Sequence, residues 1–167
     1  MEKTVEETAC DYKSELLKKG VIAFVPRGES MWPMLKNRKQ SVIVKVKTER
    51  LKPFDVALYQ RQGGVNVLHR VIKVTEGGYV MCGDSQTVPE KVEEDAVYGV
   101  MEGFYRGKTY ISADDGTYCA KVKKWYGNEK KRRRKIRRYF FFIKLKSLPK
   151  RILRKVFGGK RRKNDRS

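Results

Sequence analysis

The chain has 167 residues, with 40 Lys or Arg against 19 Asp or Glu and a formal net charge of +21. Such a length suits one compact domain with an appendage. Residues 1–120 hold 18 basic and 17 acidic residues, whereas residues 121–167 hold 22 and 2. The basicity therefore belongs to the tail, which excludes a globular domain that is itself strongly cationic.

The cysteine pattern and the hydropathy exclude several further classes. Cys10, Cys82 and Cys119 form no CxxC pair, and their odd number argues against a disulfide framework or a zinc site. No stretch approaches the ~20 apolar residues that span a bilayer. The acidic start of the chain does not have the pattern of a secretory signal. These features predict a protein of the reducing cytoplasm.

The first segment, residues 1–20, has the pattern of an amphipathic helix. Apolar residues recur there at the spacing of one helical face, at Val5, Ala9, Tyr12 and Leu16. Acidic residues lead the segment, two lysines close it, and Gly20 supplies a stop signal. A short helix of this kind needs a surface to pack against.

From residue 21 the pattern changes to short apolar or alternating runs separated by turn residues. The runs predict strands at 21–25, 41–47, 55–60, 65–74, 79–83, 96–101 and 108–113. Glycine pairs and the Val88-Pro89-Glu90 turn separate several of them. Many short strands at this spacing favour a mainly β sandwich or barrel over residues 21–120, with consecutive hairpins over 54–82.

The tail, residues 121–167, combines dense positive charge with an apolar helical stripe. The stripe consists of Phe141, Leu145, Leu148, Ile152 and Val156. Ser147 and Pro149 predict a break between two helices, with Ser147 as the cap of the second and Gly158-Gly159 as its end. We expect the last eight residues to be disordered.

Three partners suit this tail. A basic helix with clustered aromatic residues over residues 130–157 favours the anionic inner face of a membrane, to which the protein would attach peripherally. The run KKRRRKIRR would also neutralise the phosphates of a nucleic acid. The third possibility is a solvated extension with no specific partner. Clustered aromatics make the membrane the expected partner.

The stretch GESMWPML, residues 28–35, predicts a shaped loop that carries a hydroxyl group. Gly28 tolerates a positive φ angle, and Pro33 keeps Trp32 out of the helical region. Ser30 lies between them and is a candidate nucleophile. An ordinary turn that contains a serine is the alternative interpretation.

A serine nucleophile needs a neighbouring base, and the chain has one histidine, His69, inside a predicted strand. A histidine at such a position is often structural, but a strand also fixes a side chain as a general base requires. Asp84 follows Gly83 at a strand end and is a candidate to orient the imidazole. Asp84 as a plain turn residue is the alternative, and Glu90 is a second candidate acid.

The order of these motifs resembles a known family. GESMWP, DVALYQ, LHRVIKV, YVMCGDSQ and VYGVM follow one another as in the S24/S26 serine peptidases, which include type I signal peptidases and LexA-like self-cleaving repressors. The resemblance covers about residues 20–103 and implies their β fold. His69 stands where many relatives have a lysine, which resembles the Ser-His branch of the endoplasmic reticulum, archaea and spore formers.

This resemblance implies roles for the motif residues. Ser30 would be the nucleophile, His69 the general base and Asp84 or Glu90 the orienting acid. Met31 and Trp32 would line the substrate site, Pro33 would stiffen the loop, and the Ser30 amide would stabilise the oxyanion. Gly28 replaces a helping hydroxyl found in many signal peptidases. A soluble helix stands in place of their membrane anchor.

Two functional hypotheses follow. The first is a serine endopeptidase without metal or organic cofactor that cleaves an extended peptide or leader with small side chains near the cut. General removal of signal peptides and a specialised role in peptide maturation suit it equally. The second is a catalytically inactive binding module of the same fold whose basic tail docks on an anionic membrane or on nucleic acid.

Overall fold

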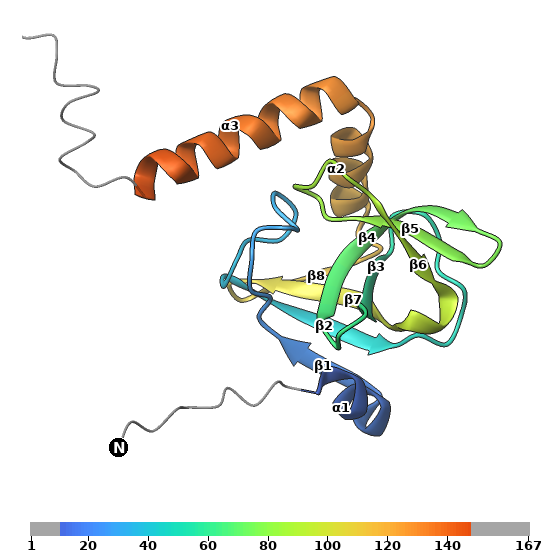
Figure 1. Ribbon diagram of the computed structural model, residues 1–167. Coiled ribbons are helices and arrows are strands. Elements are labelled where there is room, and N and C mark those ends of the chain that lie inside the picture. The colour runs from blue at the N-terminus through green and yellow to red at the C-terminus, as the bar shows by residue number, and fades with distance from the viewer. Residues whose placement is uncertain (1–10, 148–167) are drawn as a thin grey trace, which may run out of the picture. The chain divides into compact units, whose positions relative to one another are not determined.

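The computed structural model describes residues 11–147 and confirms a mainly β fold (Figure 1). Eight antiparallel strands form one sheet. They are β1 (Val21–Phe24), β2 (Gln40–Val46), β3 (Val56–Gln60), β4 (Asn66–Thr75), β5 (Gly78–Cys82), β6 (Glu90–Glu93), β7 (Val97–Arg106) and β8 (Thr109–Ser112). The helices of the described residues are α1 (Tyr12–Lys19), α2 (Gly116–Tyr126), α3 (Glu129–Ser147) and a short 3-10 turn, η1 (Glu94–Ala96).

The strand order is β1-β2-β7-β3-β4-β5-β6, and β8 pairs with the C-terminal part of β7. The hairpins expected over residues 54–82 are the β3–β4 and β4–β5 pairs. β7 lies between β2 and β3, so a strand late in the chain joins the first two strands to these hairpins. Residues of the β1–β2 loop and of the start of β4 line one cavity.

The core lies between the curved layers of this sheet. Apolar side chains that alternate along the strands fill it, for instance Val42 and Val44 of β2 and Phe104 of β7, all fully buried. A second group gathers under β3, β4 and β5, among them Tyr59 and Tyr79. Side chains of this size each stabilise the fold by about 1.5–3 kcal/mol when fully buried. The strands that carry the site are therefore held in place by this core.

α1 closes one end of the sheet. Its N-cap is Asp11, whose carboxylate accepts a hydrogen bond from the Ser14 amide at 3.1 Å, and it ends at Gly20 with φ of +78°. Leu16 is fully buried, and a Cβ atom at Gly99 of β7 would lie 2.8 Å from it. The partner surface that the sequence required is therefore the sheet itself. The predicted Val5 and Ala9 lie outside the described residues.

α2 begins at Gly116, before the predicted start of the helical tail at residue 121, and it belongs to the β unit. Its N-cap, Asp115, accepts a hydrogen bond from the Tyr118 amide at 2.7 Å. The helix buries Tyr118, Val122 and Trp125 at i, i+4 and i+7. The compact unit ends at Gly127, beyond the boundary at residue 120 that the composition suggested.

α3 forms part of a second unit, described here by itself. Asn128 caps it by accepting from the Lys131 amide at 2.9 Å, and Glu129 pairs with Arg133 at 2.8 Å. Ser147, the predicted cap of a following helix, is the last described residue of α3, and that helix lies outside the described residues. Within residues 11–147, no helix combines the length and the apolar character needed to cross a membrane.

Candidate active site

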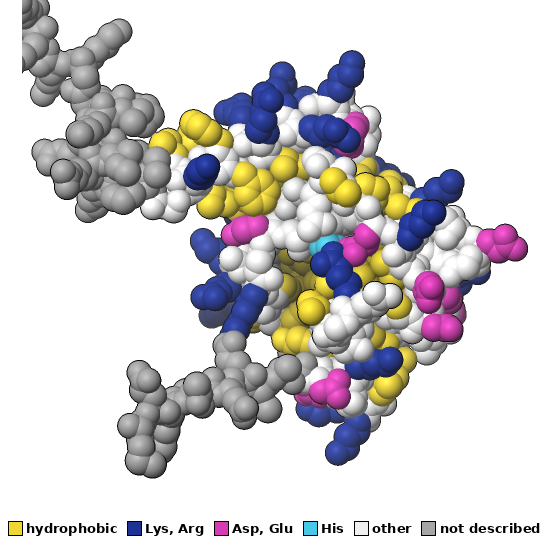
Figure 2. Space-filling view, viewed as in Figure 1, with side chains coloured by type: hydrophobic (Ala, Val, Ile, Leu, Met, Phe, Trp, Pro, Cys, Tyr) yellow, Lys and Arg dark blue, Asp and Glu magenta, His cyan; other side chains and the backbone are white. Residues whose placement is uncertain are grey.

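The β1–β2 loop and the start of β4 enclose a cavity of about 250 Å³, visible as a hollow beside the histidine in Figure 2. Residues of the loop and of β4 face each other across it. The lining consists of Pro26, Arg27, Gly28, Ser30, Met31, Leu35, Lys36, Asn37, Arg61, Asn66, Val67, Leu68, His69 and Gln86. The two residues proposed for chemistry, Ser30 and His69, thus share one cavity.

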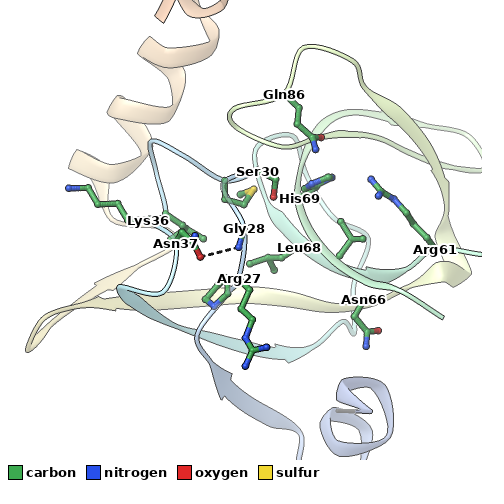
Figure 3. Close-up of a pocket in the computed structure, with 14 residues that line it drawn as sticks. Arg27, Gly28, Ser30, Lys36, Asn37, Arg61, Asn66, Leu68, His69 and Gln86 are labelled. Atoms are coloured by element: carbon green, nitrogen blue, oxygen red, sulfur yellow. Dashed lines mark hydrogen bonds between the residues drawn. The ribbon is translucent and has the colours of Figure 1, made fainter. Parts of the chain in front are cut away.

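Hydrogen bonds within the β1–β2 loop fix its shape. Gly28 has φ of +98°, a conformation that side chains disfavour, and its amide donates to the Asn37 side chain at 3.0 Å (Figure 3). Asn37 in turn donates to the Glu29 carboxylate at 3.2 Å. The Arg38 amide closes the loop on the Pro26 carbonyl at 3.2 Å. The glycine expected to shape the loop therefore does so.

The loop between β5 and β6 fixes the position of the Ser30 backbone. The Ser30 carbonyl accepts from the Ser85 amide at 2.8 Å and from the Ser85 hydroxyl at 3.2 Å. A Cβ atom at Gly83 would lie 2.6 Å from the same carbonyl oxygen, so only glycine allows this approach. Among the described residues, the Ser30 amide donates to no acceptor. That N–H is therefore available to an oxyanion.

His69 lies in β4 and is 2 % exposed. Its Nδ1 atom lies 3.0 Å from a Glu90 carboxylate oxygen and 3.0 Å from the Tyr59 hydroxyl. The Tyr59 hydroxyl donates a hydrogen bond to the Glu90 carboxylate at 2.5 Å, so its hydrogen is not directed at Nδ1. The ionised carboxylate can only accept hydrogen bonds. Nδ1 must therefore carry the proton, which leaves Nε2 as the basic nitrogen.

Figure 3 shows the Ser30 and His69 side chains next to each other in the cavity. Within residues 11–147 no hydrogen bond joins them. Bonds between a nucleophile and its base are often long before substrate binds. Ser30 and His69 thus lie in one cavity without a hydrogen bond between them.

Glu90 is the carboxylate that holds His69. Burial alone would raise the pKa of Glu90, but hydrogen bonds from Arg61, Tyr59 and His69 outweigh it and lower that pKa to about 2. Arg61 binds both carboxylate oxygens, with its Nε at 2.7 Å and an Nη at 2.5 Å. Burial lowers the pKa of His69, and the Glu90 charge opposes that shift. His69 is therefore neutral at pH 7 beside an ionised acid.

Asp84, the first candidate for the orienting acid, has a different position. It binds Arg70 through two hydrogen bonds of 2.7 and 2.8 Å, and both side chains are almost completely buried. Arg70 follows His69 in β4 and points to the opposite face of the strand. Among the described residues, no hydrogen bond joins Asp84 to His69. The acid in contact with His69 is thus the second candidate, Glu90.

The remaining motif residues separate into two groups. Met31 is buried and lines the cavity together with Gly28. Trp32 packs edge-on against Trp125 of α2, with ring centroids 5.7 Å apart. Pro33 follows a cis peptide bond and lines a second, more open cavity of about 610 Å³. Trp32 and Pro33 therefore support the Ser30 loop and do not line the site.

Sequence reasoning missed three contributors: Tyr59, Arg61 and Ser85. A signal existed for Tyr59, because strand register pairs it with Val67, two residues before His69 on the same face. No comparable signal marked Arg61 or Ser85. Both lie in loops, and their contacts depend on loop conformations that the sequence pattern does not predict. Within residues 11–147, no group of three or more His, Cys, Asp or Glu residues could hold a metal ion.

No protein-family model matches the chain, and no curated protein matches it significantly.

Proposed function

We propose that the protein is a serine endopeptidase that uses Ser30, His69 and Glu90. The observation that carries the proposal is the shared cavity: Ser30 and His69 line it together, and the imidazole is oriented by an ionised carboxylate. The motif order that resembles the S24/S26 peptidases supports the same assignment. Asp84 is not part of the proposed machinery, because it binds Arg70.

The proposed reaction follows from the protonation states. The Ser30 hydroxyl attacks the peptide carbonyl and gives its proton to His69 Nε2, and the Ser30 amide donates to the oxyanion. Glu90 stabilises the imidazolium that forms, because its carboxylate already accepts from Nδ1. His69 then protonates the leaving amine. A water molecule, deprotonated by His69, hydrolyses the acyl-enzyme and restores Ser30.

The substrate would bind as an added strand. β4 residues 66–69 pair with β3 on one side only, because pairing with β5 begins at Arg70. Their other edge borders the cavity, and an open edge is a template for an extended peptide. Small side chains near the cut are what the resemblance implies.

Hydrolysis of a pooled peptide library tests the proposal. We expect cleavage by the wild-type protein and its loss in both Ser30→Ala and His69→Ala variants, with Lys108→Ala, in the β7–β8 turn, as the control. Cleavage that survives in either site variant would contradict the proposed roles.

A non-catalytic binding module is the second candidate. The absence of a Ser30–His69 hydrogen bond within the described residues favours it. So does the surface of α3, which exposes Phe140, Phe141 and Phe142 close to many basic residues. No cleavage of any peptide, with or without anionic vesicles, would favour this candidate.

We further propose that the basic tail attaches the protein to an anionic membrane surface from the cytoplasmic side. In its described part, four consecutive apolar residues, 140–143, are exposed next to a run of basic residues. Aromatic side chains suit the headgroup boundary, and the cations attract anionic lipid. A nucleic acid duplex bound through its phosphates would use the cations but not the phenylalanines.

A further inference from the structure

The cavity that holds Ser30 and His69 has a positive lining. The described residues that line it include Arg27, Lys36 and Arg61 but no Asp or Glu. The other polar lining residues, Asn37, Asn66 and Gln86, carry neutral amides. Figure 3 shows Lys36 and Arg61 on opposite sides of the Ser30–His69 pair. Arg61 faces the pair, whereas the exposed Lys36 side chain extends from the rim of the cavity, away from the pair.

Two carboxylates adjoin the lining, and both are held by donors. Glu90 binds Arg61, Tyr59 and His69, so it balances the Arg61 charge. Glu29 accepts a hydrogen bond from Asn37 at 3.2 Å. Lys36 forms no ion pair with any described residue. Among the described residues, the Lys36 ammonium can therefore form an ion pair with a bound ligand.

The backbone around Lys36 is fixed. The Lys36 amide donates to the Gln40 side chain at 2.8 Å, and its carbonyl accepts from the Lys39 amide at 3.2 Å. The neighbouring Asn37 ties the same turn to Gly28 at 3.0 Å. The fixed turn keeps the base of the exposed Lys36 side chain at the rim of the cavity, from which its ammonium can reach a bound ligand.

We propose that this cavity selects peptides with an Asp or Glu side chain within a few residues of the cleaved bond. Cleavage of such peptides rests on the proposed peptidase function, whereas their selective binding does not. A peptide carboxylate placed beside Lys36 would gain an ion pair that a neutral amide of the same shape cannot make. A basic side chain there would be repelled.

Two matched pools of capped decapeptides test this proposal. They are identical except that one carries Glu at the scanned position and the other carries Gln. Binding is measured on the full-length Ser30→Ala protein, and on the same protein with Lys36→Glu or with Lys108→Glu. Lys108 lies exposed in the β7–β8 turn outside the cavity, so its reversal makes the same charge change. The basic tail is present in all three proteins and cancels in the comparison.

We expect about fivefold tighter binding of Glu peptides than of Gln peptides by Ser30→Ala, the range of a partly exposed ion pair. That ratio should persist with Lys108→Glu and fall to about one or below with Lys36→Glu. A ratio near one in Ser30→Ala, or an equal ratio in both charge reversals, would overturn the proposal. Cleavage of the pools by the wild-type protein is read separately, so selective binding without cleavage would refute the peptidase function alone.

Discussion

His69 shows how its neighbours set the chemistry of one side chain. It is almost fully buried, so its neutral form is favoured, yet an ionised carboxylate lies 3.0 Å from Nδ1. The carboxylate remains ionised because Arg61 binds both of its oxygens. The result is an imidazole with a fixed tautomer and a basic Nε2, which a general base requires.

The pH dependence of cleavage should reflect this environment. Burial lowers the pKa of His69 below its usual 6.5, so the base stays neutral, and cleavage persists, at pH values where a free histidine is protonated. Glu90→Gln removes the charge that raises the pKa of His69. The acid limb of the pH–rate profile of Glu90→Gln should therefore move to lower pH. The plateau rate of this variant should fall, because the imidazolium loses its counter-charge.

The measurement is kcat/KM between pH 4 and pH 8 for wild type, Glu90→Gln and Glu93→Gln. Glu93 is exposed on the same strand and is the control. An acid limb that moves to higher pH in Glu90→Gln would refute the assigned contact between Glu90 and His69.

Asp84 should matter for stability. It is fully buried against the fully buried Arg70, so Asp84→Asn leaves an uncompensated charge in the interior. We expect the free energy of unfolding to fall by about 3–5 kcal/mol, whereas an exposed ion pair contributes less than about 1 kcal/mol. Urea denaturation measures the difference, with Asp114→Asn, from the exposed Lys52–Asp114 pair, as the control. Equal effects of both variants would contradict the structural role.

The two acids mark where prediction of the site from sequence stops. Ser30 and His69 could be singled out because a hydroxyl in a shaped loop and the single histidine are visible in the sequence. Asp84 and Glu90 could not be ranked, because the choice depends on which face of β4 each one meets. Strand alternation sends His69 and Arg70 to opposite faces, and only the observed pairing of β5 and β6 brings Glu90 to the histidine side.

At the level of elements, sequence patterns predicted those strands whose apolar residues alternate or cluster. β6, with the sequence EKVE, has one apolar residue, and the sequence predicts no strand there, only the Val88-Pro89-Glu90 turn that ends where β6 begins. It is an edge strand, and pairing with β5 stabilises it more than its own composition does. α2 did carry a signal, apolar residues at 118, 122 and 125, but the change of charge near residue 121 obscured it.

Truncation should show that α2 is part of the β unit. α2 buries Tyr118, Val122 and Trp125, its Tyr118 hydroxyl accepts from Arg70 at 3.0 Å, and the Trp125 indole donates to the Asp84 carbonyl at 2.9 Å. A chain that ends at Gly127 should melt cooperatively close to the temperature of the full chain. A chain that ends at Asp115 should lose that transition, because each lost side chain removes about 1.5–3 kcal/mol.

Circular dichroism during heating measures both melting transitions. The chain that ends at Gly127 is the control for removal of the charged tail. Equal melting temperatures for the two truncated chains would mean that α2 is dispensable for the fold.

For the whole molecule, charge divides the chain into two parts. Residues 1–120 are nearly neutral, with 18 basic and 17 acidic residues, whereas residues 121–167 carry 22 basic residues and 2 acidic ones. A field of that strength does not determine the fold, but it would attract the large anionic surface that we propose as the partner of the tail. A tail docked on an anionic membrane would concentrate the proposed peptidase near membrane-bound substrates.

The surface that the tail binds can be identified by its apolar contribution. Phe141 is 61 % exposed in α3 and Leu17 is 58 % exposed in α1, so Phe141→Ser and Leu17→Ser each remove one similarly exposed apolar side chain. If aromatic residues enter a membrane, Phe141→Ser should weaken co-sedimentation with phosphatidylglycerol vesicles on the order of tenfold. Leu17→Ser should have no effect, and added salt should weaken binding of all three proteins. Equal binding of wild type and Phe141→Ser, together with tight binding to duplex DNA, would assign the tail to nucleic acid, because phosphates need its cations and leave its phenylalanines in water.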